Sequence, residues 1–194
     1  MPLPINQALE AIETGMHSLG RTFTAGLLRP GLPPEQTRTD LGERGLVPSD
    51  ELVELYGWHD GTDALEGTTL DDMHLFPGFY FASLKEALTN YDAFRDDRRW
   101  NPDWLPVFAN GGGDFLAVTC SEEPNTRGEV IHFRIEESEH PVEFASVSRL
   151  LNTVAAAYLE RVYFIDEDGY LEMDDSVFSE VARRLNPDVA WWQD

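Results

Sequence analysis

The 194-residue sequence predicts an α+β fold, a single domain in which helices pack around a mostly antiparallel sheet. Apolar residues recur at three- and four-residue steps in several segments, which is the period of amphipathic helices. Short apolar runs with strand-like composition follow one another across short turns, which favours an antiparallel sheet over a doubly wound one. The elements run helix, helix, strand, helix, several strands, helix, hairpin, helix.

The stretch from Trp104 to Cys120 is predicted to form the central hairpin of the sheet. Two apolar segments flank the turn Gly111-Gly-Gly-Asp114, and glycine allows the positive φ angles that tight turns need. A phosphate-binding turn would open a helix, so that the helix N-terminus faces the anion. Because a strand follows here, we interpret the glycines as a structural turn and leave only Asp114 open to a functional role.

The N-terminal part of the chain is predicted to be helical. An amphipathic stripe indicates one helix over residues 6–28, although Gly15 and Gly20 within it each cost about 1 kcal/mol relative to alanine. After a proline-rich break, further helices are expected at 35–44 and after Ser49, a good N-cap residue. We therefore expect an N-terminal helical appendage at residues 1–33 and the main domain at 34–194, with the appendage docked onto that domain.

The remaining segments alternate between strands, helices and turns. Ser83 followed by Glu86 resembles a capping box, and Asp168-Gly169 is a typical hairpin turn. The expected elements are a polar loop at 58–72, an aromatic strand at 73–82, a helix at 84–94, strands at 128–135 and 141–145, a helix at 146–160, a hairpin at 162–172 and a last helix at 176–185.

The charge balance limits the class of partner. There are 36 acidic residues against 14 basic ones, giving a formal net charge of -22. Such a chain would be repelled by nucleic acid and by anionic membrane surfaces. A basic protein partner, a cation or solubility alone remain open as reasons for this charge.

The single cysteine, Cys120, lies in an apolar run and suits a buried thiol in a reducing compartment. No apolar run is long enough to span a membrane and the N-terminus lacks a basic signal region, so we expect a cytoplasmic protein.

No catalytic or metal-binding motif is recognisable. His59 beside Asp60 and Asp63 is the tightest polar grouping, and together with Asp114 it could serve a metal-assisted hydrolase if all four converged. The acidic segment 166–175 does not match the spacing of a calcium-binding EF-hand loop. We therefore expect no catalytic residues, no metal and no cofactor, and rank the hydrolase last.

Two stretches together resemble a known family. Residues 46–61 (a Leu-Val-Pro entry, a helix, Leu-Tyr, then a loop ending in Asp60-Gly61) and residues 104–118 are similar to the corresponding parts of the SUKH superfamily. Gly128 and Ser146 fall where that family begins a strand and a late helix, so the resemblance covers about residues 35–160. The superfamily includes the yeast Smi/Knr cell-wall regulators and many bacterial immunity proteins. The resemblance implies an α+β domain with a non-enzymatic binding role, in bacteria often the neutralisation of a cognate toxin, commonly a nuclease.

Our leading hypothesis is therefore an immunity protein that binds a basic partner such as a cognate toxin through an acidic surface. The alternative is a regulatory scaffold or small-ligand-binding domain of the same fold, with its pocket lined by the 58–72 loop and by Phe79, Tyr80 and Phe81. For the partner interface we predict aromatic and acidic residues of the turns. These are Trp58, Asp60, Asp63, Asp71, Asp72 and Asp114.

Overall fold

The computed structural model describes residues 3–193 and confirms the α+β class. At its centre is a six-stranded sheet in which each strand pairs antiparallel with the next one along the chain. Its strands are β3 (His74–Phe76), β4 (Phe79–Phe81), β5 (Trp104–Ala109), β6 (Phe115–Thr119), β7 (Val130–Phe133) and β8 (Val142–Phe144). Most of these strands follow one another across short connections, whereas the helix at residues 84–94 lies between β4 and β5.

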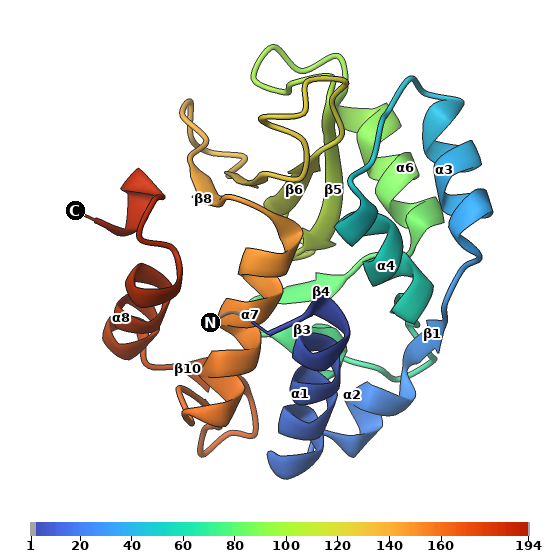
Figure 1. The fold of residues 1–194 in the computed structure, drawn as a ribbon. Coiled ribbons are helices and arrows are strands. Elements are labelled where there is room, and N and C mark those ends of the chain that lie inside the picture. The colour runs from blue at the N-terminus through green and yellow to red at the C-terminus, as the bar shows by residue number, and fades with distance from the viewer. Residues whose placement is uncertain (1–2, 194) are drawn as a thin grey trace.

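Helices and two small strand pairs surround this sheet. In Figure 1 the sheet separates α3 and α6 from α8, and α1 lies beside α7. The helices are α1 (Ile5–Ser18), α2 (Thr22–Gly26), α3 (Pro34–Gly42), α4 (Asp50–Trp58), α5 (Leu70–Met73), α6 (Leu84–Phe94), α7 (Val147–Leu159) and α8 (Asp175–Leu185), followed by a 3₁₀ turn, η1 (Ala190–Trp192). The small antiparallel pairs are β1 (Leu28–Pro30) with β2 (His59–Thr62), and β9 (Tyr163–Ile165) with β10 (Leu171–Met173).

The predicted central hairpin is present as β5 and β6. Gly111 and Gly113 have φ angles of 78° and 105°, so two of the three turn glycines adopt the conformation that other residues avoid. Phe115 is buried and meets Phe94 of α6 edge-on, with 5.1 Å between ring centroids. The hairpin is therefore a structural element of the core.

The long helix predicted over 6–28 is wrong in its extent. α1 ends at Ser18, Gly20 follows with a φ of 78°, and the chain then forms the short α2 and the strand β1. A glycine in the left-handed region commonly ends a helix, because it turns the backbone while carrying no Cβ. The amphipathic stripe continued past this break, so periodicity alone could not locate it.

Two further segments are more structured than expected. The predicted loop 58–72 contains β2 and the one-turn helix α5, and the predicted strand 73–82 is the hairpin β3–β4, turning at Gly78 with a φ of 81°. These pieces span three or four residues each, too short to show a period. β2 and β4 pair with segments that are distant in the sequence, β1 and β5.

α1 packs closely against α7 of the main domain. A Cβ at Gly15 would lie 2.5 Å from side-chain atoms of Tyr158, so the missing side chain permits the approach. Ala8, Ile12 and Met16 are fully buried on the same helix. α1 is therefore docked onto the main domain as expected, whereas the division of the chain into two parts at residue 33 stays a prediction.

Among residues 3–193, no helix is both long enough and apolar enough to cross a membrane.

Candidate interaction surface

The structure places the predicted interface residue Asp60 in a buried position on β2. Its carboxylate accepts a hydrogen bond from the backbone N–H of Leu84 at 2.7 Å, in the first turn of α6. The side chain of Arg29 approaches the other carboxylate oxygen at 3.7 Å. Because a helix N-terminus leaves backbone N–H groups unpaired and carries positive potential, this carboxylate stabilises the start of α6.

Gly61 brings β2 and α6 into this close contact. A Cβ at this position would lie 2.2 Å from the backbone nitrogen of Ser83, and the φ angle is 76°. Only glycine satisfies both restrictions. The Asp60-Gly61 pair, which ends the stretch that resembles the family and has aspartate where the family usually has asparagine, therefore fixes β2 against the start of α6.

Asp63 lies at the surface nearby. It pairs with Arg29 at 3.1 Å, and the two side chains are 48% and 45% exposed. The His59 ring hydrogen-bonds through Nδ1 to the backbone carbonyl of Arg29 at 2.7 Å. Since exposed ion pairs contribute little to stability, Asp63 is free to exchange its partner for an external cation.

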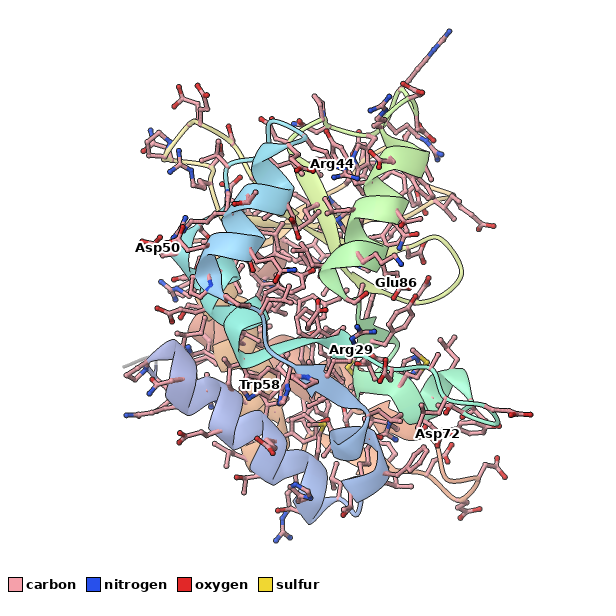
Figure 2. All side chains as sticks on the ribbon, turned by 90° about the vertical axis from the view of Figure 1, so that its right-hand side faces the viewer. Arg29, Arg44, Asp50, Trp58, Asp72 and Glu86 are labelled. Carbon is pink, nitrogen blue, oxygen red and sulfur yellow. The ribbon has the colours of Figure 1, made fainter. Side chains whose placement is uncertain are left out.

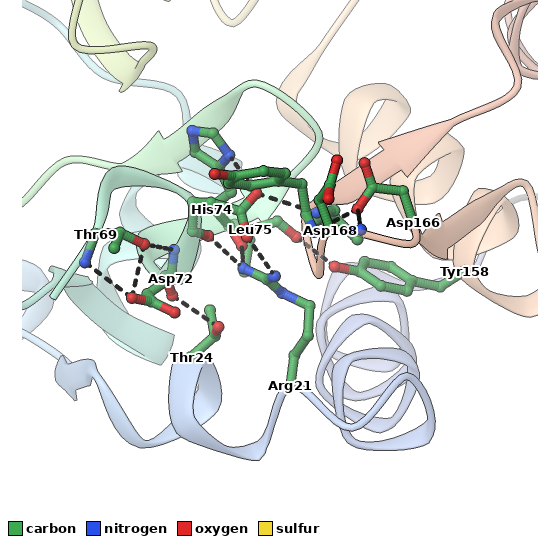
Figure 3. A network of polar contacts seen from close by, with 12 residues as sticks. Arg21, Thr24, Thr69, Asp72, His74, Leu75, Tyr158, Asp166 and Asp168 are labelled. Atoms are coloured by element: carbon green, nitrogen blue, oxygen red, sulfur yellow. Dashed lines mark hydrogen bonds and ion pairs between the residues drawn. The ribbon is translucent and has the colours of Figure 1, made fainter.

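Asp72 lies near Thr24 and Arg21 in a polar network that joins distant parts of the chain (Figure 3). Asp71 belongs to the same network through its ion pair with Arg21. Asp72 forms a capping box with Thr69 at the start of α5, and hydrogen bonds from Thr69 lower the pKa of its carboxyl group. Asp71 pairs with the buried guanidinium of Arg21 at 3.1 Å and accepts the backbone N–H of Leu171 at 3.1 Å. The Asp71 carboxylate therefore connects α5 to Arg21 and to β10, whereas the Asp72 carboxylate stabilises the start of α5 itself.

Asp114 stabilises the central turn. One carboxylate oxygen accepts the side-chain amide of Asn110 at 2.9 Å, and the other accepts the backbone N–H of Ile135 at 2.9 Å. Within residues 3–193, no three or more His, Cys, Asp or Glu side chains are grouped so that they could hold a metal ion. The convergence of His59, Asp60, Asp63 and Asp114 that the hydrolase hypothesis required is therefore not found.

Trp58 lies in a different environment, at the edge of an open groove between α1 and α4. Figure 2 shows this side of the molecule, with Trp58 next to α1 and Arg29 nearby. The groove measures about 820 Å³. Its apolar lining includes Ile5, Leu9, Leu32, Val53 and Trp58.

Two glutamates add charge to this groove. Glu10 of α1 and Glu54 of α4 line it and are exposed, and neither has an ion-pair partner among the described residues. The groove therefore combines an apolar floor with two carboxylates available to an external cation. Neither glutamate was predicted from the sequence, although the charged positions beside the apolar stripes of α1 and α4 were a usable signal.

The six predicted interface residues thus fall into three groups. Asp60, Asp71, Asp72 and Asp114 hold backbone groups of the fold, Asp63 is a half-exposed partner of Arg29, and Trp58 lines the groove. The structure brings Asp60 and Asp63 together through Arg29 and places Asp114 in another turn. These contacts do not test partner binding, so the interface assignment stays a prediction.

The comparisons with known proteins give the family. A comparison with curated proteins found no significant match. The family model described as the SMI1 / KNR4 family (SUKH-1) matches residues 45–153, which is more than half of the chain. The matched region runs from the entry to α4, through Asp60-Gly61 and the whole six-stranded sheet, into α7. The chain therefore belongs to the SMI1/KNR4 family (SUKH-1), as the motifs at 46–61 and 104–118 indicated.

Proposed function

We propose that this protein is a non-catalytic binding module that neutralises a basic cognate toxin, and that the α1–α4 groove takes part in the contact. Membership of the SMI1/KNR4 family is consistent with an immunity or regulatory role. The observation that carries the proposal is the formal net charge of -22 on a member of this family. A toxin that acts on nucleic acid carries a basic surface for the phosphates, and an acidic protein of this kind can cover that surface.

The groove supports a partner with both apolar and basic groups. Aromatic side chains that become buried on binding contribute much of the affinity of a typical interface, and the partly exposed Trp58 supplies such an anchor beside the buried Leu9 and Val53. Charged groups around the edge mainly accelerate association and select among partners, which is the role proposed for Glu10 and Glu54. The partner best suited to this groove is a helix or loop that presents one apolar side chain between lysine or arginine residues.

A binding experiment with charge-reversed variants tests the proposal. The full-length chain carrying an affinity tag is incubated with the product of the adjacent gene, and the dissociation constant is measured by calorimetry. The test variant is Glu10→Lys/Glu54→Lys, and the matched control is Glu122→Lys/Glu123→Lys, which changes two exposed glutamates of the β6–β7 loop.

Both variants change the net charge by the same amount, so only the position of the change differs. We expect the groove variant to weaken binding about tenfold or more and the control by less than threefold, since rim charges act at short range in physiological salt. Equal weakening by the two variants would reject the groove as the contact. Absence of any complex with the adjacent gene product would reject the toxin-neutralising role.

A further inference from the structure

A second cavity lies on the α8 side of the sheet and is separate from the α1–α4 groove. Its volume is about 240 Å³. The sheet contributes Phe79 and Phe144 to its walls, and the segment after β10 contributes Phe178, Trp191 and Trp192. The three residues of this segment lie outside the family match at 45–153, so the C-terminal part of this chain completes the cavity.

The C-terminal wall is held in place by specific contacts. The indole N–H of Trp192 donates a hydrogen bond to the backbone carbonyl of Glu143 on β8. The Trp192 ring packs on Phe144 and Phe178, with centroid distances of 5.7 and 5.9 Å. Trp191 is 41% exposed and lies at the rim, where the guanidinium of Arg134 stacks over its ring at 5.0 Å. The cavity is therefore bounded by aromatic rings from both sides.

A small polar cluster faces this aromatic enclosure. Glu143 is nine-tenths buried, and its Oε1 lies 2.8 Å from Nδ1 of His132 and 3.3 Å from the Arg134 guanidinium. A carboxylate accepts hydrogen bonds, so Nδ1 of His132 carries the proton and donates it to Glu143. The 3.4 Å approach of Arg134 to the same Nδ1 then brings two donors together and is not a hydrogen bond.

This arrangement leaves Nε2 of His132 as an unpaired acceptor on a residue that lines the cavity. In the neutral imidazole with its proton on Nδ1, Nε2 carries the lone pair. None of the described residues hydrogen-bonds to Nε2, and the ring packs edge-on against Phe79 at 5.5 Å. A ligand that enters between the aromatic walls therefore meets the unpaired Nε2 of His132 in a space that also holds the carboxylate of Asp175 and the hydroxyl of Ser179.

The charges of the lining argue against an anionic ligand. Arg134 and Glu143 neutralise each other, and the remaining carboxylate, Asp175 at the start of α8, repels an anion. The volume is below the usual range for sites that take drug-sized molecules, so it suits a compound of one or two rings. Flat aromatic rings pack favourably against aromatic walls in offset or edge-on geometry.

We propose that this cavity binds a small planar aromatic molecule without negative charge that carries an O–H or N–H group and donates it to Nε2 of His132. This site is independent of the contact proposed for the toxin. It also differs from the ligand pocket expected from the sequence. Of the three aromatic residues at 79–81, only Phe79 lines this cavity, and no residue of the 58–72 loop does.

Two fluorescent probes of nearly equal shape test the proposal. 2-Naphthol has the O–H donor, whereas 2-methoxynaphthalene has the same ring system without it. Each probe is titrated into the full-length protein at pH 7.5, and binding is followed through probe emission and the quenching of tryptophan fluorescence. We expect saturable one-to-one binding, with 2-naphthol about fivefold tighter, as one neutral hydrogen bond provides.

Variants separate the hydrogen bond from the aromatic wall. In His132→Phe the ring stays and the acceptor is lost, so 2-naphthol should fall to the affinity of the ether while the ether is unchanged. Trp191→Ala, at the exposed rim, should weaken both probes at least threefold, and Phe23→Ala, another exposed aromatic residue far along the chain, should change neither. Circular dichroism of each variant verifies the fold.

Three results would overturn the proposal. They are the lack of saturable binding of 2-naphthol, equal affinity of the two probes for the wild-type protein, and equal effects of Trp191→Ala and Phe23→Ala. If His132→Phe does not fold, the comparison of the two probes on the wild-type protein and the Trp191→Ala variant still decides the question.

Discussion

Replacing Asp60 by alanine is the substitution that best separates structural acidic residues from surface acidic residues in this protein. Asp60 is 8% exposed and accepts the backbone N–H of Leu84 at 2.7 Å, whereas the neighbouring Asp63 is about half exposed. Both aspartates pair with Arg29, so the two variants remove the same charge next to the same cation.

The structure sets the expected size of the effect. Asp60→Ala leaves the Leu84 N–H buried without an acceptor, which costs about 1–3 kcal/mol. Loss of a negative charge at the start of α6 adds about 0.3–1 kcal/mol. We therefore expect a loss of about 2 kcal/mol or more, and less for Asp60→Asn, which keeps an acceptor oxygen. Asp63→Ala should cost under about 0.5 kcal/mol, because its ion pair is exposed.

Urea unfolding followed by circular dichroism at 25 °C measures these differences as shifts of the midpoint. At this chain length, 1 kcal/mol corresponds to about 2–4 °C in Tm, so thermal unfolding gives a second measurement. Equal midpoints for Asp60→Ala and Asp63→Ala would refute the assignment of Asp60 as the residue that anchors α6 to β2.

Three further predictions concern other positions. Gly61→Ala should destabilise the protein by about 3 kcal/mol in urea unfolding, because the new Cβ meets the backbone of Ser83. Gly67→Ala, also at positive φ but in open space, should cost about 1 kcal/mol. Equal losses of stability in the two variants would contradict the steric argument. Burial lowers the pKa of His74, so the unfolded state binds the proton more readily than the folded state as the pH falls through about 6.5. The free energy of unfolding should therefore decrease more between pH 7.5 and 5.5 in the wild type than in His74→Gln. Parallel pH profiles of the two proteins would contradict this. Burial raises the pKa of the Cys120 thiol, so a disulfide reagent at pH 8 should modify it only at the rate of unfolding; rapid reaction of the native protein would show that the thiol is accessible.

The central sheet could be predicted from the sequence because its signals are local. The glycine turn at 111–113 lies between two apolar runs, so the β5–β6 hairpin follows from a short-range pattern, and each strand of the sheet pairs with its neighbour in the chain. Ser49, Ser83 and Ser146 are the N-caps of α4, α6 and α7, as expected of residues that accept backbone N–H groups.

The functions of individual acidic residues could not be predicted because their partners are remote in sequence. Asp114 accepts the backbone N–H of Ile135, Asp60 that of Leu84, and Asp71 that of Leu171. An aspartate in a polar loop gives the same pattern whether it faces solvent or a buried N–H group. Only the fold separates the two cases.

Both cavities depend on contacts that no local pattern contains. The α1–α4 groove forms because the N-terminal helix lies beside a helix some forty residues later, and the aromatic cavity forms because Trp191 and Trp192 return to the sheet. The amphipathic stripe of α1 and the tandem tryptophans were visible in the sequence. The elements against which they pack could not be inferred from it.

The salt dependence of association tests the central proposal, binding of a basic partner by an acidic surface, most directly. The association rate constant of the full-length protein with the purified product of the adjacent gene is measured by stopped-flow fluorescence between 50 and 500 mM NaCl. Because a net charge of -22 should attract a basic partner from a distance and salt screens that attraction, we predict a fall of at least tenfold over this range. A rate constant that stays unchanged with salt, or the lack of any complex at 50 mM, would contradict the proposal.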